Sequence, residues 1–301
     1  MTITRRAVAA LISVAAATTL AAPAQADVQR TVSSAAVPSA VVQSAPSSGW
    51  NDWTCKPSSQ HPRPVVLAHG LGANAQTNWI VIAPALRKAG YCVFSTTYGG
   101  TSIAGDLVGG LGPMEKSAKT FGDFVDRVRT STGSAKVDVV GHSEGSTVPA
   151  YYLKLLGGAS KVKNFIAFGS NYRGTTLLGL GTLAKILGLQ GVLEGVGCPA
   201  CAQFLPGSDF LEELNDGGVT VPGPRYVNIV SRLDTVVTPY TSGVIDEPGV
   251  TNVVLQDSCR LDAAGHVGMA IDPNVVSRIK HYLDPRQEPT PICVPFFALG
   301  A

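Results

Sequence analysis

The sequence predicts an α/β protein with a mostly parallel central sheet and helices on both of its faces. From residue 50 onward, short apolar runs alternate with segments in which apolar residues recur at helical spacing. This alternation is typical of parallel strands connected by helices. Of the 301 residues, 45% are hydrophobic and 15% are charged, which is the balance of a globular chain. We therefore expect one domain over residues 50–301.

Six apolar runs are the expected strands, and they are as short and continuous as buried parallel strands should be. They cover residues 65–68, 91–97, 137–140, 164–169, 226–230 and 252–255.

Four further segments carry a single apolar stripe at steps of three and four residues, which predicts helices. The last of them starts at Asp272-Pro273, a common signal for a helix N-terminus. The stripes consist of Trp79, Ala83 and Leu86; Met114, Ala118, Phe121, Val125 and Val128; Val148, Tyr152 and Leu155; and Val275, Ile279 and Leu283.

Residues 175–210 break the alternation of strands and helices. This stretch is rich in Gly and Leu, has few charges, and is too long for a plain connector. We expect an apolar cap or lid over a site, and an additional packed pair of helices is a compatible alternative.

The first 26 residues are expected to be a signal peptide. Arg5 and Arg6 precede an apolar, Ala-rich stretch, and Ala24-Gln25-Ala26 has the form of a cleavage site. The apolar run is too short to span a bilayer. Residues 27–49, rich in Ala, Ser, Val and Pro, are expected to form a flexible leader. The sequence thus predicts a secreted protein.

Charge and cysteine content narrow the classes of function. The chain has 23 Lys and Arg against 21 Asp and Glu. Loss of Arg5 and Arg6 with the signal peptide makes the numbers of basic and acidic residues equal. Nucleic-acid binding requires clustered positive charge, so we do not expect it. Export places the six cysteines in an oxidising compartment. Cys198 and Cys201 are expected to form a local structural disulfide, and without a nearby second pair of ligands we expect no metal.

Residues 141–145 read Gly-His-Ser-Glu-Gly and match the G-x-S-x-G nucleophile elbow. An expected strand precedes the motif and an expected helix follows it, which is the strand-turn-helix setting that the elbow requires. Gly141 and Gly145 suit a turn that leaves no room for side chains. Ser143 would then lie exposed at a helix N-terminus, where developing negative charge is stabilised.

A serine hydroxyl needs a base to become a nucleophile. In enzymes with this elbow the acid and the base follow the serine along the chain, and only His266 and His281 do so. His281 belongs to the expected C-terminal helix, whereas His266 lies in a loop of small residues, so His266 is the candidate base. His69 is expected to make structural hydrogen bonds, and His142 to point away from the nucleophile.

Asp234 is the candidate acid that orients His266. It follows the expected strand 226–230 at the carboxyl edge of the sheet, where such enzymes hold their third catalytic residue. Asp262, four residues before His266, is a candidate for a supporting partner. The competitors for the acid role are Asp246, Asp257 and Asp262.

Acyl transfer also needs donors for the tetrahedral oxyanion. One should be the backbone N–H of Glu144, the residue after the nucleophile. The second is expected from the His-Gly-Leu-Gly loop at residues 69–72, and we nominate the N–H of Leu71.

Together these residues resemble secreted lipases of the α/β-hydrolase superfamily. The His-Gly-Leu-Gly loop with Asn78-Trp79, followed by the Gly-His-Ser-Glu-Gly elbow, is similar to bacterial class 2 lipases. The segments 168–178, 226–239 and 252–265 are similar to the fungal lipase B group. The resemblance runs from about residue 50 to the C-terminus.

This resemblance implies an α/β-hydrolase fold and hydrolysis of triacylglycerols or other carboxylic esters without a cofactor. Ser143, Asp234 and His266 occupy the positions of the family's triad, and Leu71 and Glu144 occupy its oxyanion positions. The fungal group has Thr in place of Leu71 and Gln in place of Glu144. The resemblance also implies the disulfides Cys55–Cys92 and Cys259–Cys293, which leaves Cys198–Cys201.

Three alternative functions are compatible with parts of the sequence. Residues 70–75 look like part of a dinucleotide fingerprint, but the second expected strand ends without the acid that would hold a ribose. A secreted acyltransferase would use the same triad and pass the acyl group to an alcohol. A binding protein of the same fold would not need Ser143, Asp234 and His266 together. The expected partners are a lipid or ester substrate and a lipid–water interface, with the chain acting as a monomer.

Overall fold

The computed structural model describes residues 49–102, 105–176, 178–180, 197–286 and 288–297. The signal peptide expected at residues 1–26 and residues 27–48 of the expected leader lie outside the described residues. So do residues 177 and 181–196 of the expected cap, which leaves that prediction without a structural description of its middle part.

The described part of the chain forms a six-stranded sheet in the order β2-β1-β3-β4-β5-β6, and every neighbouring pair is parallel. The predicted parallel sheet is therefore confirmed. The strands are β1 (Val65–Ala68), β2 (Val93–Ser95), β3 (Val137–His142), β4 (Val162–Phe168), β5 (Arg225–Val230) and β6 (Thr251–Val254).

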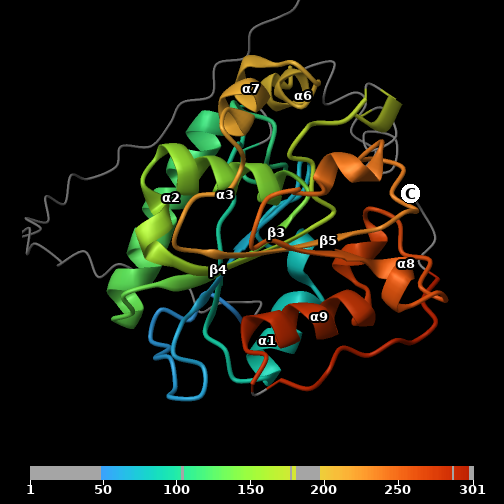
Figure 1. Ribbon diagram of the computed structural model, residues 1–301. Helices are drawn as coiled ribbons and strands as arrows, with labels where there is room; N and C mark the ends of the chain where they lie inside the picture. Colours follow the sequence, from blue (N-terminus) through green and yellow to red (C-terminus); the bar gives the residue numbers. More distant parts are fainter. Residues whose placement is uncertain (1–48, 103–104, 177, 181–196, 287, 298–301) are drawn as a thin grey trace, which may run out of the picture. The chain divides into compact units, whose positions relative to one another are not determined.

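Helices cover both faces of this sheet. Figure 1 shows α1 and α9 together on one face and α2 and α3 on the other, with α6 and α7 beyond α3. None of the helices in the described ranges is long and apolar enough to cross a membrane. The bounds are α1 (Ile82–Lys88), α2 (Met114–Thr132), α3 (Glu144–Leu155), α6 (Pro199–Gln203), α7 (Asp209–Asn215), α8 (Leu255–Ser258) and α9 (Pro273–Leu283).

The core has two parts, one on each face of the sheet. Alternate residues of β1 point into them: Val66 and Ala68 into one cluster, Val65 and Leu67 into the other. Because all four side chains are fully buried, β1 is apolar on both faces and reads as an uninterrupted apolar run. The predicted stripes of α2 and α9 pack into opposite clusters, and each large apolar side chain buried there contributes about 1.5–3 kcal/mol.

Some predicted element boundaries were wrong. Only residues 93–95 of the expected strand 91–97 pair with β1. Ser95, the last of these residues, hydrogen-bonds the Asn51 side chain through both of its backbone groups, at 2.7 Å and 2.9 Å. Trp79 is buried as expected but lies in a separate 3₁₀ turn, and Leu155, at the end of α3, is 37% exposed.

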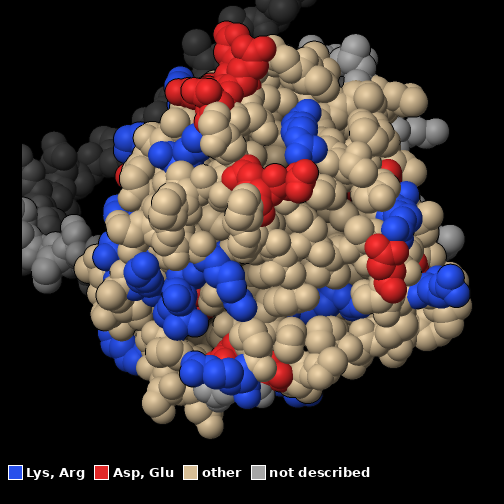
Figure 2. Space-filling view, viewed as in Figure 1, with Lys and Arg blue, Asp and Glu red and all other residues tan. Residues whose placement is uncertain are grey.

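Three disulfides join distant and local segments of the described chain: Cys55–Cys92, Cys198–Cys201 and Cys259–Cys293. The first attaches the segment before β1 to the start of β2. The last attaches the segment after α8 to the C-terminal residues. Figure 2 shows basic and acidic side chains on the same face, with one of the acidic groups at the position of α7.

Asp272 introduces a pH-dependent component of stability at the start of α9. Its side chain is fully buried and caps the helix by accepting the Asn274 N–H at 2.8 Å, while its Oδ2 has no hydrogen-bond partner. Burial raises the pKa of Asp272 to about 7, and the neighbouring Asp262 carboxylate adds to this. The folded protein therefore retains a proton that the unfolded chain releases, so this stability is complete below the unfolded pKa and is lost as the pH rises through about 7.

We expect Asp272→Asn to flatten the pH dependence of unfolding, because Asn preserves the cap but cannot ionise. The loss of unfolding free energy between about pH 5 and about pH 8 should shrink by about 1–3 kcal/mol. Urea denaturation at several pH values measures this, with the exposed Asp106→Asn as the matched control. Parallel pH profiles for the wild type and Asp272→Asn would contradict the prediction.

Candidate active site

The nucleophile elbow is built where β3 passes into α3. Ser143 stands between them with φ 57° and ψ −120°, a strained conformation for a residue with a side chain. A Cβ on Gly141 would lie 1.8 Å from the Gly145 carbonyl oxygen, and one on Gly145 would lie 1.8 Å from that of Ala68. Glycine at both positions is therefore a steric requirement of the crossing.

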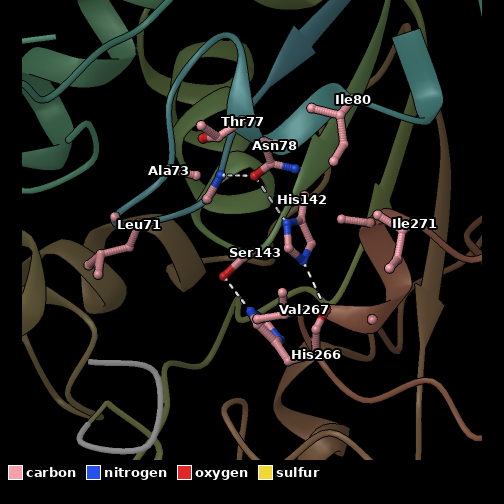
Figure 3. A pocket seen from close by; sticks show the side chains of 14 residues that line it. Leu71, Ala73, Thr77, Asn78, Ile80, His142, Ser143, His266, Val267 and Ile271 are labelled. Carbon is pink, nitrogen blue, oxygen red and sulfur yellow. Dashed lines mark hydrogen bonds between the residues drawn. The ribbon is translucent and has the colours of Figure 1, made fainter. Parts of the chain in front are cut away.

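Ser143, His266 and Asp234 form one hydrogen-bonded chain. The Ser143 Oγ lies 2.8 Å from the His266 Nε2, and the His266 Nδ1 lies 2.7 Å from the Asp234 Oδ2. Figure 3 shows the first of these contacts at the pocket. Because the carboxylate only accepts, Nδ1 carries the proton and Nε2 is left to accept from the serine hydroxyl. This arrangement suits a general base for Ser143.

The environment of Asp234 keeps it ionised. Burial opposes its charge, but the adjacent His266 and the backbone N–H groups of Val236 and Val237 outweigh burial and hold the pKa of Asp234 below its ordinary value. The two backbone bonds measure 2.9 Å and 2.7 Å and fix the other carboxylate oxygen. A carboxylate oriented in this way can stabilise a charged imidazole.

The three other aspartates considered for the acid role do not contact the imidazole of His266. Asp246 is exposed, and Asp257 pairs with Arg232 at 2.6 Å. Asp262 lies behind the His266 loop, where it accepts the Ala264 N–H at 2.9 Å. It thus contacts the loop that carries the base, as expected for a supporting partner, without contacting the imidazole.

The loop with the second expected oxyanion donor passes directly over Ser143. A Cβ on Gly70 would lie 3.0 Å from the Ser143 Cβ, and the Gly70 N–H is held by the Asn78 Oδ1 at 2.9 Å. Leu71 follows in the pocket wall. Glu144 is the first residue of α3, so the preceding chain offers its N–H no helical partner. Leu71 thus follows the residue that packs on Ser143, and Glu144 follows Ser143 in the chain.

His69 is a structural residue of this loop. Its Nδ1 donates to the Gly70 carbonyl at 2.9 Å, its Nε2 accepts the Tyr98 N–H at 3.2 Å, and its ring stacks on Tyr98. Burial lowers the pKa of His69 to about 4, so it remains neutral and keeps this pattern of donor and acceptor around neutral pH.

His142 contributes to the site in a way that the sequence did not indicate. Its Nε2 donates to the backbone carbonyl of His266 at 3.1 Å, its Nδ1 lies 3.2 Å from the Asn78 Oδ1, and its ring stacks on Phe168. Figure 3 shows His142 between Asn78 and the His266 loop. Burial lowers the pKa of His142 to about 3, so the neutral ring has one N–H, which holds the loop of His266. Only its adjacency to Ser143 hinted at this, because the partners are distant in sequence.

Ser143 and His266 open into a cavity of about 310 Å³. Its wall is largely apolar, and Ile80 and Ile271 in that wall are 62% and 42% exposed. Among the described residues, no group of three or more His, Cys, Asp or Glu side chains could hold a metal ion. The lining consists of residues 70–73, 77, 78, 80, 142, 143, 266–268, 270 and 271.

Comparison with known proteins agrees with this geometry. A family model described as lipase (class 2) matches residues 62–277. The structure is similar to Aspergillus fumigatus lipase B (TM-score 0.58, 20% identity, 75% of this chain and 54% of that one). It is also similar to Bacillus licheniformis lipase BlEst2 in its propeptide form (TM-score 0.54, 17% identity, 81% of this chain and 54% of that one). A third similar structure is Pyrococcus furiosus esterase Pf2001 (TM-score 0.51, 18% identity, 74% of this chain and 80% of that one). The chain thus spans about half the length of the two lipases, and the likeness shows the α/β-hydrolase fold.

We expect Gly141→Ala to prevent formation of the elbow, because its Cβ would overlap the Gly145 carbonyl oxygen. The loss of unfolding free energy should exceed about 3 kcal/mol. Gly133→Ala is the control: Gly133 has a positive φ, 73°, but nothing lies within 4 Å of an added Cβ, so only about 1–2 kcal/mol should be lost. Equal losses for the two variants in chemical denaturation would show that the crossing is not sterically restricted.

Proposed function

The chain belongs to the class 2 lipase family, and we propose that it hydrolyses carboxylic esters of medium or long acyl chains, triacylglycerols included, through an acyl-Ser143 intermediate. The observation that carries the proposal is the hydrogen-bonded chain from Asp234 through His266 to Ser143 at the floor of an apolar cavity. An ordered nucleophile, base and acid in a pocket are the requirements of acyl transfer.

In the acylation step, the Ser143 Oγ attacks the ester carbonyl carbon while the His266 Nε2 takes the hydroxyl proton. The tetrahedral intermediate collapses, and His266 returns that proton to the departing alcohol, leaving an acyl-Ser143 ester. Water then attacks with His266 again as base, and the acid product and free Ser143 form. Asp234 holds the imidazole in the required tautomer throughout and stabilises its charged form.

The developing oxyanion would be bound by the backbone N–H groups of Leu71 and Glu144. Gly70 lies against Ser143 and Glu144 follows it directly, which supports placing both donors beside the reacting carbonyl. Each donor of this kind stabilises the transition state by about 3 kcal/mol. Because Leu71 has no side-chain donor, the proposed hole consists of backbone groups alone.

The substrate class is supported by the cavity wall and the charge of the chain. Ile80, Ile271 and Val267 line the cavity that opens from Ser143, and apolar walls favour an uncharged acyl chain. The partly exposed Ile80 and Ile271 would also suit contact with a lipid–water interface. Basic and acidic residues are nearly balanced, 23 against 21, which offers no general attraction for anionic substrates.

We also propose that the protein is secreted. Three disulfides in the described chain support maturation in an oxidising compartment, and the expected signal peptide at residues 1–26 would direct it there.

Ser143→Ala should remove turnover of a chromogenic ester while the circular dichroism spectrum and the unfolding midpoint stay close to those of the wild type, because only the nucleophile is lost. The same assay with added alcohol measures how the acyl group partitions between water and the alcohol, which separates a hydrolase from an acyltransferase. Retained turnover by Ser143→Ala would refute the proposed mechanism.

Asp234→Asn should lower kcat by about 10⁴-fold, because an amide no longer enforces the tautomer of His266 that accepts the serine proton. Asp257→Asn makes the same chemical change in an exposed pair with Arg232 and should leave kcat unaffected. If Asp234→Asn lowered kcat no more than Asp257→Asn, another acid would have to orient the base.

A further inference from the structure

Glu144 combines two features that the mechanism does not use together. Its backbone N–H is a proposed oxyanion donor, while its side chain is completely buried and neither carboxyl oxygen has a hydrogen-bond partner. The side chain does not line the substrate cavity. A carboxyl group is therefore enclosed in the protein directly behind the catalytic serine.

The carboxyl of Glu144 reaches the loop that holds the other donor. The point at which a Cβ of Gly110 would stand is 2.2 Å from the Glu144 Oε2 and 2.8 Å from the Leu71 Cα. The Glu144 carboxyl and the Leu71 backbone thus both lie against Gly110 on the side where other residues carry a side chain. The main chain of Glu144 follows Ser143 directly, and its side chain lies against Gly110 close to Leu71.

Backbone hydrogen bonds join the Leu71 loop to the segment that contains Gly109 and Gly110. Gly72 donates to the Gly109 carbonyl at 2.9 Å, and Gly109 donates back to Ala73 at 2.8 Å. Gly110 donates to the Tyr98 carbonyl at 2.8 Å. These bonds join two glycine-rich segments, and the Glu144 side chain is the side chain nearest to the Cα substituent position of Gly110.

The surroundings of Glu144 favour its uncharged form. No ion pair among the described residues involves it, and burial raises its pKa well above the ordinary value. The titratable side chains of the adjoining segments are Tyr98 and His69. Burial raises the pKa of Tyr98 further above neutrality and lowers that of His69 to about 4, so neither carries a charge that could pair with a carboxylate. An ionised Glu144 would also oppose the developing oxyanion.

We propose that Glu144 is a positioning residue that works as a neutral carboxylic acid, wedged against Leu71 and Gly110 to set the distance between the two oxyanion donors. The catalytic part of this inference rests on the proposed ester hydrolysis; the protonation part does not. The two parts call for separate measurements.

The first measurement is proton linkage in the absence of substrate. If folded Glu144 is protonated, unfolding releases a proton above its unfolded pKa, and Glu144→Gln lacks this release. The ratio of the unfolding equilibrium constants, wild type over Glu144→Gln, should therefore rise about tenfold per pH unit from about pH 5.5 to about pH 7. The exposed Glu212→Gln is the matched control and should give a flat ratio. A flat ratio for Glu144→Gln would overturn the neutral-acid assignment.

The second measurement is steady-state turnover of a soluble ester. Glu144→Ala removes the wedge and should lower kcat at least tenfold with less than about a threefold change in KM, because the donors act mainly in the transition state. Glu144→Gln, uncharged and of equal size, should recover at least about tenfold of that loss. A kcat for Glu144→Gln as low as that of Glu144→Ala, or a wild-type kcat in Glu144→Ala, would overturn the proposal.

The two measurements distinguish a failure of this inference from a failure of the proposed function. If the wild type shows no turnover that depends on Ser143, the proposed function fails, and the linkage measurement still decides whether Glu144 is neutral. If Glu144→Ala does not fold, the linkage and kcat values of Glu144→Gln decide the proposal: a flat ratio, or a kcat reduced more than about tenfold from the wild type, overturns it.

Discussion

The crossing of α3 over the ends of β1 and β3 is the constraint on which the site depends. At Gly141 and Gly145 the backbones approach so closely that an added Cβ would lie 1.8 Å from a carbonyl oxygen. Because the helix begins immediately after Ser143, this crossing sets the hydroxyl, the helix N-terminus and the proposed oxyanion donor of Glu144 at one point. A helix N-terminus favours negative charge, so the steric requirement and the electrostatic one are met by the same turn.

Buried polar contacts bring the other loops to this point. The Ser231 Oγ donates to the Ala264 carbonyl at 2.6 Å, which joins the loop of the acid to the loop of the base. His142 donates to the backbone carbonyl of His266, and the Asn78 side chain accepts from the Gly70 N–H. Each of these hydrogen bonds satisfies a backbone group that would be costly to bury alone. The three proposed catalytic residues are thus positioned by loops that hold one another.

The sequence predicted those features of the structure that depend on residues close together in the chain. The parallel sheet and the stripe of α2 follow from patterns within a few residues, and the structure confirms the sheet and buries the stripe. The elbow is also local, since glycines at 141 and 145 directly encode a turn without space for side chains. The predicted ends of β2 were wrong: pairing with β1 stops at Ser95, whose backbone groups hydrogen-bond the side chain of Asn51, a residue distant in sequence.

Long-range packing explains what the sequence left open. Four aspartates followed Ser143 as candidates for the acid, and only the folded chain shows which one reaches His266. The contact of His142 with the His266 carbonyl and the enclosure of Glu144 behind Leu71 and Gly110 depend on loops more than 30 residues apart in the chain. Neither has a signal in its own neighbourhood of the sequence.

The central claim is that Asp234, His266 and Ser143 act as one relay, and covalent labelling tests it most directly. A fluorophosphonate should phosphonylate the Ser143 Oγ with loss of fluoride, and mass spectrometry of the digested protein should place the added mass on the peptide that contains Ser143. His266→Ala should slow this labelling by about 10³-fold or more. Labelling at another residue, or at an unchanged rate in His266→Ala, would contradict the account.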